Sequence, residues 1–88
     1  MDDLLFGDYY SDIPDYMRGP LVDYVKHHKK PGDFLCSVIC NDLRGAVGLA
    51  DKNNLPIIKL YVMWFENVAP YNCYGSPEIM KKWLNINK

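Results

Sequence analysis

Residues 56–68 read PIIKLYVMWFENV and are the most apolar part of the chain. Pro56 suits the first position of a helix, because the missing N–H has no intrahelical partner there. Apolar side chains would fall on nearly every side, which is typical of a helix covered from several directions. A buried strand is the alternative, since β-branched and aromatic residues are frequent here, but the length and the opening proline favour a helix. We therefore predict a central helix over 56–68.

Two further helices are predicted in the first half of the chain. The first covers about 18–28, and its buried face, at i, i+3, i+4 and i+7, consists of Leu21, Tyr24, Val25 and His28. Pro20 lies near its beginning, where a proline is tolerated because the first N–H groups lack intrahelical partners. The second covers 33–40, and Asp33 places a carboxylate at the positive end of the helix dipole.

A third helix is predicted between two polar breaks, Asn41–Asp42 and 51–54. Asp42 can cap its first turn. The apolar face of this helix consists of Leu43, Ala46, Val47 and Ala50. Gly45 and Gly48 each cost about 1 kcal/mol relative to alanine inside a helix. Their presence predicts that another helix packs very close to this backbone.

A last short helix is predicted after the loop at 71–75, with Ser76 as its cap and Pro77 in its first position. The chain is therefore expected to be all-α, a compact bundle of about five short helices around the 56–68 segment. We place a single helical domain at 17–88 and an acidic, tyrosine-rich arm at 1–16.

The composition argues against several classes of protein. The chain has 88 residues, of which 49% are hydrophobic, and this argues against intrinsic disorder. The net charge is −1, and no basic stripe is interleaved with aromatic residues, so nucleic-acid binding is not expected. No stretch approaches the roughly 20 apolar residues that span a membrane. With no signal peptide and an odd number of cysteines, the expected location is the cytoplasm.

No catalytic motif is present, and the protein is not expected to be an enzyme or to bind a cofactor. Cys36 and Cys40 share a helical face and could form a zinc site with His27 or His28, but no standard ligand spacing is complete. Cys73 lies in a loop, where a reactive thiol could be accessible, although nothing in the sequence brings a histidine to it. We interpret the cysteines as small hydrophobic residues and predict no metal site.

Polar residues at the helix boundaries are the first candidate binding residues. They are Asn41, Asp42, Asp51 and Asn54. Asp42 and Asp51 are too far apart along a helical segment for a paired acid–base dyad, and capping is the simpler interpretation. A ligand pocket remains the alternative if all four side chains converge.

Tyrosines and acidic residues form the second set of candidates. The loop before the last helix contributes Tyr71, Tyr74 and Ser76, and it leads into a helix N-terminus, which favours anions. The arm contributes Asp8, Tyr9, Tyr10 and Asp12. Tyrosine is a frequent anchor at protein interfaces, although a loop packed on the last helix and a solvated acidic surface are the simpler interpretations.

Residues 13–84 carry a set of positions that resembles small bacteriophage accessory proteins. These positions are Ile13–Pro14, Leu21, Tyr24–Val25, Pro31–Leu35, Val38, Asn41–Leu43, Ala46, Ala50–Asp51, Asn54, Pro70, Gly75–Ser76 and Trp83. The chain departs from the pattern at Met17, Pro20 and Tyr74, where threonine, a helix former and tryptophan are common. The resemblance implies no known reaction. It does imply a setting in which small phage proteins bind, redirect or block host machinery, including defence systems.

These observations lead to two hypotheses. The first is a non-enzymatic phage accessory protein that binds a host defence or regulatory protein, using the acidic arm and exposed tyrosines. The second is a binder that sequesters a small signalling nucleotide at the polar helix boundaries. A homodimer is a further expectation, because the 56–68 helix is more apolar than one small core needs.

Overall fold

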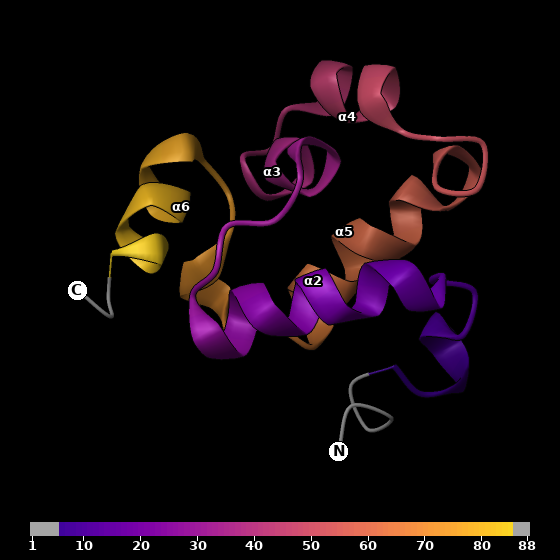
Figure 1. Cartoon of the computed structure of the whole chain (residues 1–88), viewed down its shortest axis with the longest axis horizontal. Coiled ribbons are helices and arrows are strands. Elements are labelled where there is room, and N and C mark those ends of the chain that lie inside the picture. Colours follow the sequence, from indigo (N-terminus) through magenta and orange to yellow (C-terminus); the bar gives the residue numbers. More distant parts are fainter. Residues whose placement is uncertain (1–5, 86–88) are drawn as a thin grey trace.

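The computed structural model describes residues 6–85 (Figure 1). Over this range the chain forms five α-helices and no strand, which confirms the all-α prediction. The helices are α2 (Asp15–His27), α3 (Asp33–Ile39), α4 (Leu43–Leu49), α5 (Ile58–Asn67) and α6 (Pro77–Leu84). Three short 3-10 turns join them, namely η1 (Asp8–Tyr10), η2 (Leu55–Ile57) and η3 (Tyr71–Cys73). None of these helices is long and apolar enough to cross a membrane.

Helix α5 lies at the centre of the core, as predicted. Its residues Tyr61, Trp64 and Phe65 are at most 1% exposed. Phe34 of α3 meets Tyr61 edge-on, with the ring centroids 5.3 Å apart. Phe6 stacks on Trp64 with a centroid distance of 5.4 Å. The first turn of the predicted 56–68 helix is the separate 3-10 turn η2, so the α-helix proper begins at Ile58.

The segment before α2 is part of the core from residue 6 onward. Phe6, Tyr10 and Ile13 are at most 7% exposed. The Tyr10 hydroxyl donates a hydrogen bond to the backbone oxygen of Met63 in α5 at 3.3 Å. Much of the predicted arm therefore packs against the central helix, while residues 1–5 lie outside the described range.

Helix α2 begins at Asp15, three residues earlier than predicted. Pro14 precedes it with extended backbone angles (φ −60°, ψ 147°). The Arg18 side chain donates to the carbonyl oxygen of Ile13 at 3.0 Å and so fixes the entry into the helix. Pro20 consequently lies in the helix interior rather than in its first turn.

A network of hydrogen bonds joins α2, η3 and α6. The Trp83 ring nitrogen donates to the backbone oxygen of Tyr24 at 2.8 Å. The Tyr24 hydroxyl donates to the backbone oxygen of Cys73 at 2.6 Å. His28 lies against Trp83, with its Nδ1 at 2.8 Å from the Trp83 carbonyl oxygen. Buried polar atoms on these three elements are thereby paired, as stable packing requires.

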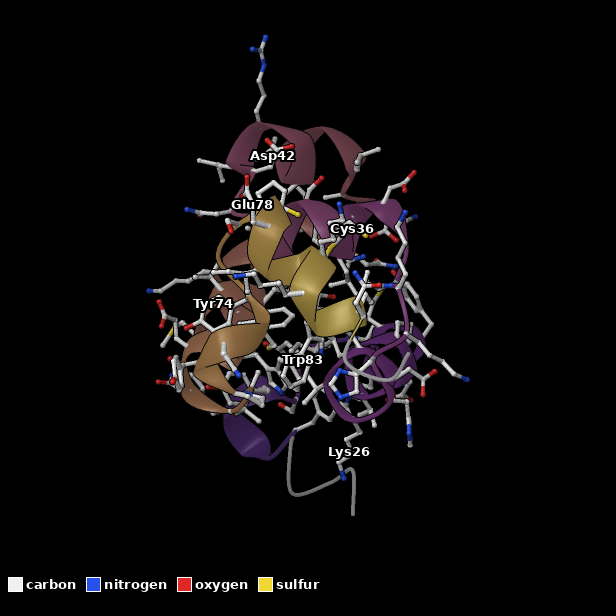
Figure 2. The ribbon with its side chains drawn as sticks, turned by 90° about the vertical axis from the view of Figure 1, so that its left-hand side faces the viewer. Lys26, Cys36, Asp42, Tyr74, Glu78 and Trp83 are labelled. Atoms are coloured by element: carbon white, nitrogen blue, oxygen red, sulfur yellow. The ribbon has the colours of Figure 1, made fainter. Side chains whose placement is uncertain are left out.

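The molecule is thin relative to its width. Its principal extents are 33 × 32 × 20 Å, and the shortest equals about two helix diameters. Helix α4 lies at one end and packs mainly on α3, away from α2 and α6 (Figure 1). Figure 2 shows the same end from the side, with Asp42 next to α4. One side of α4 therefore faces solvent.

Candidate functional site

Of the two candidate aspartates, Asp42 caps a helix as the simpler interpretation predicted, whereas Asp51 binds backbone N–H groups of the loop before η2. Asp42 accepts a hydrogen bond from the Gly45 N–H at 3.0 Å at the start of α4. Asp51 accepts one from the Asn54 N–H at 2.8 Å. Its other oxygen accepts a 2.6 Å hydrogen bond from the Tyr16 hydroxyl. This bond lowers the pKa of Asp51 and raises that of Tyr16, because it favours the ionised carboxylate beside the neutral phenol.

The four polar boundary residues do not converge on one pocket. Asn54 is 3% exposed, and its side-chain oxygen accepts a 2.5 Å hydrogen bond from Tyr61. Asn54 and Asp51 border a hollow beside α2 and α3, whereas Asn41 and Asp42 border a different one between α3 and α5. The shared ligand site that the sequence left open is therefore not formed.

The candidate residues of the arm differ in their exposure. Tyr9 is 59% exposed and Asp12 is exposed. Tyr10 is buried against α5 and cannot serve as a surface anchor without leaving the core. Asp8 lies in η1, and its side chain lies outside the part that the structure describes. The accessible part of the arm is smaller than the sequence suggested.

The loop before α6 places its candidate residues in three different settings. Ser76 caps α6 as predicted, accepting a hydrogen bond from the Ile79 N–H at 3.1 Å. Tyr71 is 87% exposed, so this side chain does not pack on the last helix. Tyr74 is half-buried, and its ring centroid lies 5.6 Å from that of Phe65 in α5.

The thiols and histidines do not form a reactive cluster in the described range. Cys73 is fully buried, and burial raises its pKa to about 11, which agrees with the interpretation as a small hydrophobic residue and not with the alternative of an accessible loop thiol. Cys36 and Cys40 are half-buried, and burial raises the pKa of both. The His28 ring is engaged with Trp83. Within residues 6–85, no three His, Cys, Asp or Glu side chains are placed to hold a metal ion.

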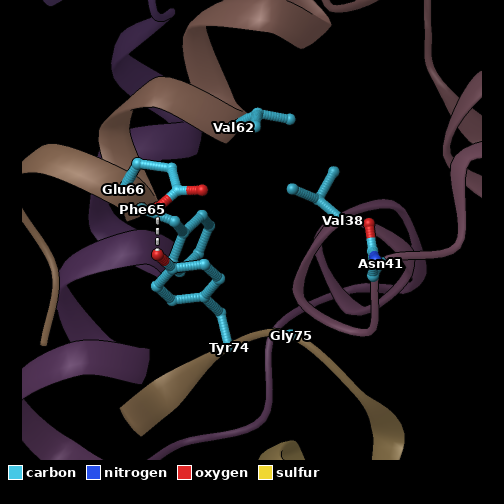
Figure 3. Close-up of a pocket in the computed structure, with 7 residues that line it drawn as sticks. All are labelled: Val38, Asn41, Val62, Phe65, Glu66, Tyr74 and Gly75. Atoms are coloured by element: carbon cyan, nitrogen blue, oxygen red, sulfur yellow. Dashed lines mark hydrogen bonds between the residues drawn. The ribbon is translucent and has the colours of Figure 1, made fainter. Parts of the chain in front are cut away.

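A groove runs between α3 and α5 and ends at the loop before α6 (Figure 3). Its wider part has a volume of about 270 Å³ and is bordered by Val38, Asn41, Val62, Phe65, Glu66 and Tyr74. A narrower part of about 30 Å³ shares Val38, Asn41 and Val62 and continues to Leu43, Ala46 and Ile58. Because the two parts share three residues, we treat them as one feature, the α3–α5 groove.

At one end of the α3–α5 groove, a hydrogen bond joins two of the lining residues. The Tyr74 hydroxyl donates to Oε2 of Glu66 at 2.6 Å, as Figure 3 shows. This bond raises the pKa of Tyr74 to about 12. Gly75 has a φ of 127°, and its N–H donates to the carbonyl oxygen of Ile39 at 2.7 Å. That backbone bond attaches the loop to α3 and directs Tyr74 toward α5.

Two carboxylates without an ion-pair partner in the described residues, and one amide, lie at the rim of the groove. Asp42 and Glu66 are exposed, and neither has a cationic side chain within ion-pair distance in the described part of the chain. Asn41 has a φ of 63°, and no hydrogen bond joins its side-chain amide to any described residue. An apolar floor with an acidic rim suits a ligand that is itself apolar and cationic.

Helix α4 exposes most of its apolar side chains. Leu43 and Val47 lie one helical turn apart and are 69% and 48% exposed, and we call these two residues the α4 face. Leu49, 52% exposed, lies on another side of the helix and borders the hollow beside α2 and α3. Ala46 is the only residue of α4 that is buried. The prediction that Leu43 and Val47 share a buried stripe with Ala46 is therefore wrong. The α4 face adjoins the α3–α5 groove, since Leu43 borders both.

The two glycines of α4 differ in what surrounds them. No atom outside the helix lies within 4 Å of the position that a Cβ of Gly48 would occupy. At Gly45 a Cβ would collide with the Asp42 carboxylate and the Ser37 hydroxyl. Gly45 therefore makes room both for the cap of its own helix and for Ser37 of α3, so the predicted close approach of another helix is confirmed at Gly45 and wrong at Gly48.

The sequence search missed the α4 face as well as Val38, Val62 and Glu66. The sequence did contain one signal that α4 exposes apolar side chains. The seven residues of α4 carry apolar side chains at 43, 46, 47 and 49, which are too many directions for one buried stripe. The groove residues gave no comparable signal, because they meet only through the packing of α3 on α5.

Comparison of the chain with protein-family models, with curated proteins and with solved structures gave no match.

Proposed function

We propose that this is a non-enzymatic accessory protein of a bacteriophage, which binds a host protein and inhibits a defence or regulatory factor. The single observation that supports binding is the α4 face. Small monomeric proteins rarely expose clustered apolar side chains unless the cluster contacts a partner. The phage setting comes from the sequence resemblance described above.

The α4 face is suited to a protein partner. It consists of aliphatic side chains on a single short helix at one end of the molecule, where nothing in the described chain covers them (Figure 2). Val62 of α5, 48% exposed, extends this surface toward the groove. Burying such side chains against a partner is favourable, at roughly 25 cal/mol per Å² of apolar surface.

No observation favours the alternative of a nucleotide binder. The wider part of the groove, about 270 Å³, is at the lower limit of typical ligand pockets, which span about 300–1,000 Å³. Glu66 at the rim of the wider part and Asp42 at the narrower part would repel phosphate groups. A basic hollow is lined by His28, Lys30 and Lys81, but it lies at the C-terminal ends of α2 and α6, where the helix dipoles disfavour anions.

The test compares three tagged proteins in co-purification from a lysate of the bacterial host. The double variant Leu43→Ser/Val47→Ser removes the α4 face, and Tyr71→Ser removes a still more exposed large side chain elsewhere. We expect the wild type and Tyr71→Ser to recover the same partner, and the double variant to lose it. Recovery of that partner by the double variant at the wild-type level would overturn the proposal.

Light scattering on the purified protein separates a host partner from self-association. The proposal predicts a monomer for the wild type and for the double variant. A wild-type dimer that the double variant dissociates would show that the α4 face joins two copies of this chain, in agreement with the homodimer expectation and against the host-binding role.

A further inference from the structure

We propose that the α3–α5 groove receives an amphipathic helical segment of the bound protein, with apolar side chains on the groove floor and a lysine or arginine beside Glu66. This inference rests on the proposed function, because it names the chemistry of the partner that the α4 face would contact. It adds a second contact region with its own charge requirement.

The floor of the groove selects apolar side chains. Val38 and Val62 face each other across it from α3 and α5 (Figure 3). Phe65 closes the wider part, and Ala46 and Ile58 line the narrower part. A volume of about 270 Å³ accommodates side chains of a partner rather than a whole folded element. The partner must therefore insert apolar side chains from a backbone that stays above the rim.

The rim of the groove selects positive charge. Oε2 of Glu66 accepts the Tyr74 hydrogen bond, which fixes the carboxylate at the wider end. Oε1 of Glu66 has no partner in the described residues and is available to a cation. Asp42 adds a second unpaired negative charge at the narrower end. Cationic side chains of a partner would thus be favoured at both ends.

A helix suits this groove better than an extended segment. Recognition by strand addition requires an exposed sheet edge, and residues 6–85 contain no strand. Proline-rich segments bind grooves lined mainly by aromatic rings, whereas this floor is mainly aliphatic. Amphipathic helices bind apolar grooves between helices through side chains spaced at i, i+3 and i+4.

The groove and the α4 face form one continuous surface. Leu43 belongs to the α4 face and borders the narrower part of the groove, and Val62 borders both parts of the groove. A segment that lies in the groove would therefore bring the rest of the same partner over α4.

The experiment measures fluorescence anisotropy of labelled model peptides with the full-length protein. The first peptide is an amphipathic helix built from leucine and lysine. The second replaces each lysine with glutamate, and the third scrambles the first so that the apolar stripe is lost. We expect saturable binding of the first peptide, at least about five-fold weaker binding of the second, and none of the third. Equal binding of the first and third peptides would overturn the inference.

Charge reversal at Glu66 tests whether the peptide binds in the groove. Glu66→Lys should weaken the lysine peptide by at least about five-fold and should improve binding of the glutamate peptide. Asp12→Lys is the matched control, since Asp12 is an exposed acid that borders neither part of the groove. Equal effects of the two reversals would show that only overall charge matters, and would overturn the inference. If Glu66→Lys loses helix content, Glu66→Gln replaces it, with an expected loss of about two- to five-fold.

Different results would contradict the groove inference and the proposed function. If the host partner is lost with Leu43→Ser/Val47→Ser but is retained by Glu66→Lys and Val62→Ser, the α4 face binds and the groove inference is wrong. If the double variant retains the partner, the proposed function itself is wrong.

Discussion

The Tyr74 hydroxyl lies 2.6 Å from Oε2 of Glu66, to which it donates a hydrogen bond across one end of the α3–α5 groove. The two residues come from the loop before α6 and from α5, and the Tyr74 ring also packs against Phe65. This contact orients the carboxylate that we assign to the partner's positive charge.

Removing the Tyr74 hydroxyl should change how stability depends on alkaline pH. The pKa of Tyr74 is raised by the hydrogen bond to Glu66, from about 10 to about 12. A raised pKa in the folded state stabilises the protein fully below about pH 10, and this contribution is lost as the pH rises toward about 12. In urea unfolding, the stability difference between wild type and Tyr74→Phe should therefore shrink as the pH rises through this range. A difference that stays constant with pH would contradict the assignment.

Truncation of Phe6 should destabilise the whole domain. Phe6 is 5% exposed and stacks on Trp64 of the central helix. Phe6→Ala should reduce the free energy of unfolding by about 3–5 kcal/mol, as for other buried aromatic residues. Tyr9→Ala, three residues later and 59% exposed, should cost less than about 1 kcal/mol. Equal effects in urea denaturation would show that residue 6 is not part of the core.

The contrast between these residues shows where sequence reasoning succeeds. The caps at Asp42 and Ser76 were predictable, because each depends on a residue three positions away. The central helix was predictable from its own composition. The burial of Phe6 was not, because its partner Trp64 is 58 residues away and the acidic residues around it suggested a solvated arm. Burial depends on tertiary contacts that local patterns do not encode.

Loss of the Tyr61 hydroxyl should destabilise the protein, because it leaves a buried oxygen without a hydrogen-bond donor. Tyr61 is fully buried and donates to the side-chain oxygen of Asn54, which is 3% exposed. Tyr61→Phe keeps the ring but leaves that oxygen without its donor. We expect the free energy of unfolding to fall by about 1–3 kcal/mol. Tyr71→Phe, at a position 87% exposed, should leave it unchanged, and an equal loss in both variants would contradict the assigned hydrogen bond.

The two glycines of α4 should respond differently to alanine. Gly48 has open space at its Cβ position, so Gly48→Ala should stabilise the protein by about 0.5–1 kcal/mol through helix propensity. At Gly45 the new Cβ would displace the capping carboxylate of Asp42, which offsets that gain by about 1 kcal/mol. In thermal unfolding, Gly48→Ala should have a clearly higher melting temperature than Gly45→Ala. The reverse order would mean that the cap geometry is wrong.

The candidate site was less predictable than the fold. Sequence reasoning identified Asn41, Asp42 and Tyr74, which do border the groove, but it assigned them to separate motifs. It placed Leu43 in the core, because a helical stripe reveals which side chains align and does not reveal whether another element covers them. In a molecule only 20 Å thick, α4 packs mainly on one helix, α3, and most of its apolar side chains face solvent.

The central claim is that the protein binds its partner through the α4 face and the adjoining groove. Hydrogen–deuterium exchange, compared between the free protein and its complex with the co-purified partner, tests this claim most directly. The account predicts slower exchange at residues 38–49 and 58–66 and unchanged exchange at 9–16 and 77–84. Protection confined to 9–16 or to 77–84, with 38–49 unchanged, would contradict it.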